Sequence, residues 1–237
     1  MRAKILSTQS NRLVDMRMDS HADAIDGRVP DAGGGGLTGS KEGLLAAARE
    51  AFARRGYEGA RVAEIAARAG VNKQLVYHYF GSKEALYKAV LADVYREIRR
   101  EEQGLHLANL PAEEAMRRLV EFSFDYLARH RDFVAILADA NTHGGRHIEN
   151  AGGLAAANRP IIDLLQETLE RGAAEGVFRR GLDAFHVYLS IAGMAFFYFA
   201  NNHTLSRGFG RELGSKGAAD ERRAHIVDFA LNALRAR

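Results

Sequence analysis

The sequence predicts an all-α protein of about nine helices. Only 3 prolines occur among 237 residues, and helices tolerate proline poorly in their interiors. Apolar residues recur at three- and four-residue intervals in most segments, which is the spacing of one helix face. No segment alternates convincingly between apolar and polar residues, as a half-buried strand would.

Composition and charge narrow the class of protein. Hydrophobic residues make up 47% of the chain, enough for a packed core, and the absence of cysteine excludes disulfides, thiolate metal sites and cysteine nucleophiles. Residues 41–100 carry twelve Lys or Arg and seven Asp or Glu, whereas residues 101–237 carry sixteen and eighteen. A basic block of this kind is expected of a nucleic-acid contact, although a solvated surface has a similar composition.

Residues 1–39 are predicted to form a disordered tail, because their charged, Ser and Gly residues follow no period. No apolar stretch follows Arg2 and Lys4, so the start of the chain does not resemble a signal peptide. The longest apolar stretch, Ala184–Ala200, barely reaches the length of a membrane span. We interpret it as a buried core helix in a cytoplasmic protein that contacts no membrane.

Helix caps and apolar periodicity place the elements in order. The first predicted helix is capped by Ser40 and ended by Gly56, and the second runs from Val62 to about Ala69. The third is capped by Asn72 and ends near Phe80, and the fourth is capped by Ser82 and runs from Lys83 to about Gln103. Longer helices follow from Pro111 to about His130, from Pro160 to Gly176, from an Asp183 cap to about Asn202 and from Asp220 to Arg235. A shorter helix is predicted from Asp132 to about Ala140, a loop or weak helix start at 141–158, and a loop at 204–219.

The second and third helices have the spacing of a helix-turn-helix. Ala66 is small where the two helices pack closest, and Gly70 suits a left-handed turn. Val76 and Phe80 lie four residues apart and face the core, so the side chains between them lie on other faces of the third helix.

The segment GYEGARVAEIAARAGVNKQLVYHYFGSKEALYKAVL, residues 56–91, resembles the TetR family of bacterial transcriptional regulators. The run VYHYF followed by GSKEAL carries most of this resemblance. It implies a DNA-binding domain at residues 40–103 and a larger helical domain at 104–237 that dimerises and binds an effector. The implied function is a sequence-specific regulator, usually a repressor, that a small molecule releases from a palindromic operator in double-stranded DNA.

By the same resemblance, the third helix and its flanks contact DNA. Lys73 and Gln74 would approach base edges, whereas a phosphate or base contact is implied for Tyr77, His78 and Tyr79, and a phosphate contact for Lys83. Leu75 offers no hydrogen bond and would at most touch a thymine methyl group.

Two positions depart from the family pattern. Members often have Ser or Thr at the position of Arg61 and Arg at the position of Ala63, so both the hydroxyl cap and that arginine are missing here. Arg61 is the candidate for a replacement phosphate contact.

The second half of the chain offers a dimer face and a ligand site. The helices at 184–202 and 220–235 carry more apolar surface than one core needs, which suits a four-helix homodimer interface, although burial within one chain is an alternative. Aromatic and apolar residues with a few polar tips are candidates for a ligand site, although such residues usually form core. These candidates are Phe122, Tyr126, Phe133, Leu137, Leu165, Tyr188 and Met194.

No motif supports catalysis, and we predict no cofactor, metal or enzymatic activity. His143 and His147 have the four-residue spacing of a helical metal site, but the two glycines between them favour a loop. Two alternatives remain beside the regulator: an architectural or nucleoid-associated DNA-binding protein without a ligand, and an all-helical enzyme or partner-binding module.

Overall fold

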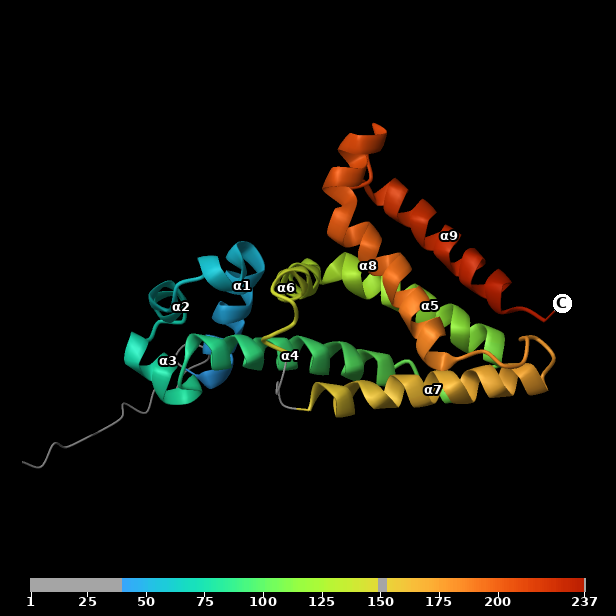
Figure 1. Cartoon of the computed structure of the whole chain (residues 1–237), viewed down its shortest axis with the longest axis horizontal. Helices are drawn as coiled ribbons and strands as arrows, with labels where there is room; N and C mark the ends of the chain where they lie inside the picture. The colour runs from blue at the N-terminus through green and yellow to red at the C-terminus, as the bar shows by residue number, and fades with distance from the viewer. Residues whose placement is uncertain (1–39, 149–152, 237) are drawn as a thin grey trace, which may run out of the picture. The chain divides into compact units, whose positions relative to one another are not determined.

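The structure is a computed structural model that describes residues 40–148 and 153–236 (Figure 1). The tail predicted at residues 1–39 lies outside the described residues. The described part is all-α, as predicted, and its one β-type pairing is an isolated bridge between Phe178 and Arg235. The helices are α1 (Lys41–Gly59), α2 (Val62–Arg68), α3 (Lys73–Phe80), α4 (Lys83–Gln103), the 3-10 helix η1 (Leu107–Asn109), α5 (Ala112–Arg129), α6 (Arg131–Thr142), α7 (Leu154–Ala174), α8 (Ala184–Phe209) and α9 (Lys216–Leu234).

Four predicted N-caps have the expected geometry. In each, a side-chain oxygen accepts a hydrogen bond of 2.8–3.0 Å from the backbone N–H three residues later. These caps are Ser40, Asn72, Ser82 and Asp183. The cap fixes the first residue of a helix, so α3 and α4 begin at the predicted residues.

Several boundaries in the second half were predicted wrongly. Helix α7 begins at Leu154, so Pro160 lies in its second turn, where it removes one intrahelical hydrogen bond without ending the helix. Helix α8 continues to Phe209 and stops where Gly210 adopts the left-handed conformation. Helix α9 begins after a Ser215 cap rather than at Asp220, and α6 begins at Arg131, one residue before the predicted Asp132.

Helices α1 to α4 pack around a small core. Phe52 of α1, Ile65 of α2, Val76 of α3 and Leu86 of α4 are all buried there. Ala66 is also buried, which fits the predicted close approach of α2 and α3. The short joints leave little freedom, so this core fixes the direction in which α3 points.

Helix α6 is tied to the end of α1 through Asp139. Gly56 interrupts α1 with φ 66, and the next backbone N–H, that of Tyr57, donates 2.9 Å to Asp139 Oδ2. The Tyr87 hydroxyl of α4 donates to the same oxygen over 2.7 Å. One half-buried carboxylate therefore holds α1, α4 and α6 together.

A second contact joins the same helices nearer the start of α1. The Arg49 guanidinium forms ion pairs with Glu97 of α4 and Asp132 of α6. Hydrogen bonds to both carboxylates outweigh partial burial and raise the Arg49 pKa. The four N-terminal helices are thus attached to α6 at two places, a full two turns apart on α1.

Helices α5, α7, α8 and α9 form the other part of the core, and within one chain α8 is buried on one side only. Its inner side, including Ala195 and Phe199, packs on α5. Its outer side is open to solvent. In the described residues α8 has the length and composition of a membrane span, a test that soluble core helices also pass. The exposed large apolar side chains of α8 and α9, here called the apolar face, are Phe185, Leu189, Phe197, Phe209 and Phe229.

The close approach of Asp139 to Gly56 predicts that a side chain at position 56 lowers the stability of the fold. A Cβ on Gly56 would lie 2.4 Å from Asp139 Oδ1, and the φ of 66 is itself unfavourable for alanine. We expect Gly56→Ala to lower the unfolding free energy by about 3 kcal/mol, from backbone strain together with a weakened buried hydrogen bond. Urea unfolding of the full chain measures this loss.

Gly144→Ala is the control for a positive φ, because Gly144 also has a φ of 66 and no atom within 4 Å of its built Cβ. It measures the cost of a positive φ, about 1 kcal/mol, whereas Gly56 combines φ 66 with an extended ψ of 179 that essentially only glycine adopts. Equal losses in the two variants would show that Asp139 does not press on Gly56.

Candidate DNA-binding interface and effector region

The turn between α2 and α3 has the geometry that its sequence predicts. Gly70 has φ 71, and the Val71 N–H donates 3.0 Å to the Ala66 carbonyl, which closes α2. Asn72 then caps α3. Because Val76 is buried and Phe80 is half-buried, the rotation of α3 about its axis is fixed.

The outer side of α3 presents polar and aromatic side chains to solvent. Lys73, Gln74 and His78 are exposed, and Tyr77 and Tyr79 are 40% and 39% exposed. The Lys73 ammonium lies 5.5 Å from the centre of the Tyr77 ring, so a cation and a phenol are held together on one turn. Five of the eight predicted DNA-contact residues are therefore exposed on this one short helix.

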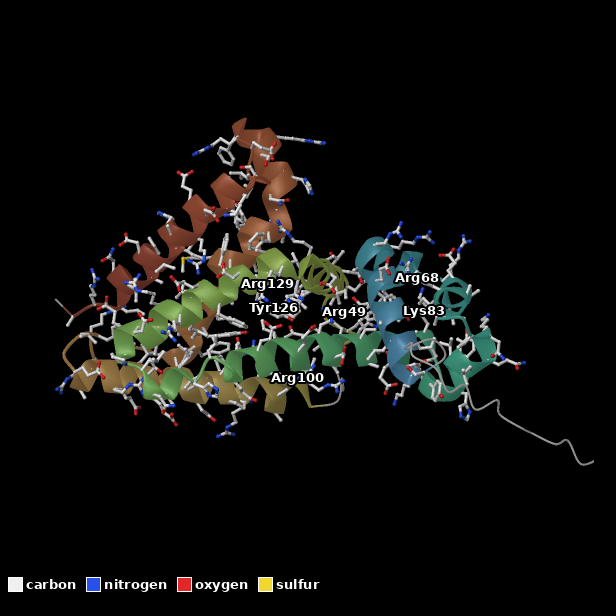
Figure 2. All side chains as sticks on the ribbon, turned by 180° about the vertical axis from the view of Figure 1, so that it is seen from behind. Arg49, Arg68, Lys83, Arg100, Tyr126 and Arg129 are labelled. Atoms are coloured by element: carbon white, nitrogen blue, oxygen red, sulfur yellow. The ribbon has the colours of Figure 1, made fainter. Side chains whose placement is uncertain are left out.

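The other three predicted residues differ in their surroundings. Leu75 is half-buried. Lys83, at the start of α4, donates 3.2 Å to the Glu58 carbonyl and lies 4.8 Å from the centre of the Tyr57 ring, so it already braces α1 (Figure 2). Arg61 occupies the N-cap position of α2 without a side-chain cap, is 80% exposed and lies 3.9 Å from Glu64.

Sequence reasoning missed Lys41 as a neighbour of this surface. Its ammonium lies 5.7 Å from the centre of the Phe80 ring, at the end of α3. The side chain is exposed. A lysine directly after the Ser40 cap was the available signal, but nothing in the sequence placed the start of α1 beside the end of α3.

Three of the predicted ligand residues form one aromatic group. Tyr126 lies between Phe122 and Phe133, with ring centres 5.7 Å and 5.6 Å away. Tyr95 of α4, which the sequence did not suggest, contacts Phe133 at 5.8 Å. This group joins α4, α5 and α6.

A buried polar pair, Arg99 and Glu102, lies beside Tyr188, another of the predicted ligand residues. The Arg99 guanidinium donates 3.2 Å to the Tyr188 hydroxyl and lies 2.8 Å from Glu102, but the Arg99–Glu102 contact is not aligned as a hydrogen bond. Burial raises the pKa of the Glu102 carboxyl from 4.5 to about 7, and Arg99 offsets this only in part. Two ionisable groups without full partners inside a core are characteristic of functional sites.

The remaining ligand candidates pack in the core or lie apart from this region. Leu165 is fully buried and Leu137 is half-buried. Met194 lines a cavity of about 300 Å³ between α8 and α9, together with Phe229 and Leu234. A larger cavity of about 670 Å³ lies between the end of α8 and the start of α9. Both cavities adjoin the apolar face.

His143 and His147 pack against aromatic rings. The His147 ring centre lies 4.2 Å from that of Tyr57 and 6.0 Å from that of His143. Burial lowers the pKa of His147, which favours the neutral ring. His143 lies 2.8 Å through Nδ1 from the Asp139 carbonyl. The pair therefore supports the joint between α1 and α6.

Both halves of the chain match models of one protein family. Residues 44–90 match the model described as bacterial regulatory proteins, tetR family. Residues 112–230 match the model described as tetracyclin repressor-like, C-terminal domain. These matches confirm the resemblance found in residues 56–91.

Individual relatives agree with the family models. The HTH-type transcriptional repressor NicS of Pseudomonas putida is 37% identical over 83% of this chain and 92% of its own. The HTH-type transcriptional repressor KstR2 of Rhodococcus jostii is 28% identical over 62% of this chain and 72% of its own. Among solved structures, FadR from Bacillus subtilis in complex with stearoyl-CoA has a TM-score of 0.61 at 18% identity, covering 82% of this chain and 99% of that chain, a likeness of fold alone.

The raised pKa of Glu102 predicts a pH dependence of stability. Because the folded-state pKa lies above the unfolded value, the neutral carboxyl stabilises the fold below about pH 4.5, and this contribution is lost as the pH rises through about 7. The loss amounts to as much as about 3 kcal/mol. Glu102→Gln cannot ionise, so its unfolding free energy should lack this decrease in urea titrations at successive pH values.

Glu114→Gln, at an exposed carboxylate of α5, is the control and should follow the wild type. A constant difference between Glu102→Gln and the wild type at every pH would contradict the raised pKa.

Proposed function

The chain belongs to the TetR family of bacterial transcriptional regulators, and we propose that it represses transcription by inserting α3 into operator DNA until a small-molecule effector releases it. The observation that carries this proposal is the outer side of α3. An Asn72 cap and a buried Val76 hold a row of exposed donors and rings at the solvent side of a basic segment.

The contacts proposed for α3 follow from its exposed chemistry. Lys73 and Gln74 lie in its first turn, the part of a recognition helix that reaches base edges in the major groove. Tyr77, His78 and Tyr79 supply hydroxyl and imidazole donors to the flanking phosphates. Leu75 contacts at most a thymine methyl group.

Lys83 and Arg61 are proposed to bind phosphates on either side of α3. Lys83 stands beside the Ser82 cap, so its ammonium and the N-terminus of α4 attract the same anion. Arg61 reaches into solvent in place of the hydroxyl cap that family members often carry.

The apolar face is proposed as the homodimer interface. Leu189 and Phe197 are exposed on α8 with Gly193 halfway between them, and no atom lies within 4 Å of a Cβ built on Gly193. A helix of a second chain fits closely against such a gap. Two chains related by a two-fold axis then present two copies of α3 to a palindromic operator, about one helical turn apart.

Residues 40–103 are proposed as the DNA-binding domain and residues 104–237 as the effector and dimerisation domain. The effector is proposed to bind beside Phe133 and Tyr95, because Tyr95 contacts Phe133 and lies within electrostatic range of Tyr188 and Arg99. This chemistry suits a molecule with an apolar body and a hydrogen-bond acceptor at one end. Displacement of Phe133 moves α6, and Asp139 transmits that movement to α1.

Two finer points complete the proposal. The protein is proposed to act on the nucleoid within the cytoplasm, where its operator lies. We assign it no enzymatic activity, since its function follows from binding at two sites.

Gln74 provides the test of base recognition. Gln74→Ala should relax the base preference at one operator position and cost about 1–3 kcal/mol against the preferred base, because an amide reads a base edge through directed hydrogen bonds. Selection of bound duplexes from a random pool, before and after the substitution, measures the preference.

Lys83→Ala serves as the contrasting variant in the same assay. It should weaken binding to all duplexes alike and lower the slope of log affinity against log salt by about one unit, as loss of a phosphate contact does. An unchanged base preference in Gln74→Ala would remove Gln74 from the reading surface.

The dimer interface is tested at Phe197, which is 57% exposed in the single chain. Phe197→Glu places a carboxylate inside the proposed interface, where desolvation opposes association. Analytical ultracentrifugation should show a shift from dimer to monomer, with at least about tenfold weaker binding to a palindromic operator. Ala156→Glu, at an exposed position of α7, should remain dimeric.

A further inference from the structure

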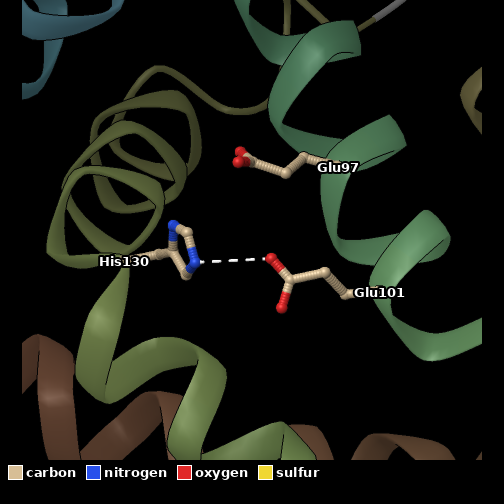
Figure 3. A group of neighbouring side chains, drawn as sticks. All are labelled: Glu97, Glu101 and His130. Atoms are coloured by element: carbon tan, nitrogen blue, oxygen red, sulfur yellow. Dashed lines mark ion pairs between the residues drawn. The ribbon is translucent and has the colours of Figure 1, made fainter. Parts of the chain in front are cut away.

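Three ligating side chains converge beside the joint between α5 and α6 (Figure 3). Glu97 and Glu101 lie one turn apart on α4 and point towards His130, the residue between α5 and α6. His130 Nε2 lies 3.6 Å from Glu101 Oε1, and one ligand atom of each side chain lies within 4.8 Å of the others. All three side chains are partly buried.

The spacing and the atom types suit a divalent cation. Zinc binds imidazole nitrogen and carboxylate oxygen at about 2.0–2.2 Å, so two of its ligand atoms lie about 3–4 Å apart. Side-chain rotations that move these ligand atoms by less than about 1 Å would bring their separations to about that range. One nitrogen with two oxygens is a donor set for borderline first-row cations, whereas Ca²⁺ and Mg²⁺ prefer oxygen alone.

The surrounding arginines leave one oxygen on each carboxylate available. Glu97 contacts Arg49 through Oε2 over 2.5 Å, and Glu101 contacts Arg129 through Oε2 over 3.2 Å. Oε1 of Glu101 faces His130 instead. A cation held by the Oε1 atoms therefore leaves both ion pairs in place, and the arginines orient the carboxylates.

Tyr126 provides a second, independent observation. Its side chain is fully buried, and its hydroxyl has no hydrogen-bond partner among the described residues. The ring stacks on His130 with centres 4.1 Å apart (Figure 2 labels Tyr126). Burial raises the pKa of this phenol, and the charges of Glu97 and Glu101 raise it further, so the hydroxyl lies within the field of the cluster. A buried hydroxyl without a partner is costly unless something beside it accepts a hydrogen bond from it.

We propose that Glu97, Glu101 and His130 bind a first-row divalent cation of the zinc type, with the Tyr126 hydroxyl donating to a water molecule on that cation. The ligands come from α4 and from the residue between α5 and α6. The cation therefore fastens α6 to α4 beside Arg49 and stabilises the arrangement in which α6 holds α1. The site is separate from the bases read by α3 and from the apolar face.

Isothermal titration of the untagged full-length protein with Zn²⁺ tests this site. We expect one ion per chain for the wild type, at least about tenfold weaker binding for Glu101→Gln and for His130→Asn, and a rise in melting temperature with Zn²⁺ that both variants lose. Circular dichroism establishes that both variants are folded, and Glu101 is exposed enough for its amide to be tolerated.

Glu114→Gln and His203→Asn are the matched controls, since each removes a side chain of the same type elsewhere, Glu114 with a side chain 41% exposed and His203 exposed. Both should bind Zn²⁺ like the wild type. The proposal is overturned if the wild type binds no ion, if Glu101→Gln and His130→Asn retain wild-type affinity, or if the controls lose affinity to the same extent.

Discussion

The attachment of α1 to α6 through Asp139 is the contact on which the rest of the structure depends. Its carboxylate accepts both the Tyr57 N–H and the Tyr87 hydroxyl, and it fits only because Gly56 has no Cβ. A charged oxygen with two donors in a half-buried site tolerates little displacement, because losing either bond leaves a desolvated group. The four N-terminal helices, α3 among them, are therefore attached to α6 by a residue more than fifty positions beyond α3 in the chain.

Helices with one buried and one exposed side occur in both functional regions of the molecule. In α3, Val76 enters the core while Tyr77 points outward, and in α8, Ala195 is buried while Phe197 is exposed. The outward side chains are aromatic in both cases, but their neighbours differ. Lys73 and His78 accompany Tyr77, which suits a polyanion, whereas Leu189 and Gly193 accompany Phe197, which suits another helix.

Local chemistry made the first half of the chain predictable. Caps such as Asn72 and Ser82 act within one turn, so sequence alone locates α3 and α4 to the residue. The second half depends on distant contacts. Glu102 lies in a helix rich in charge, where a carboxylate is normally solvated, and tertiary packing on α4 buries it. Likewise the ligands Glu101 and His130 are 29 residues apart, and no local pattern joins them.

The exposed apolar side of α8 has a consequence for gene control. A chain must pair with a second copy before two copies of α3 are presented together. Its binding to the operator therefore depends on its concentration through pairing as well as through DNA binding. At low concentration the population of paired chains grows with the square of the total, so operator occupancy rises more steeply than for a monomeric regulator. Phe197 and Leu189, far from any base, thereby help to set the threshold at which the gene is silenced.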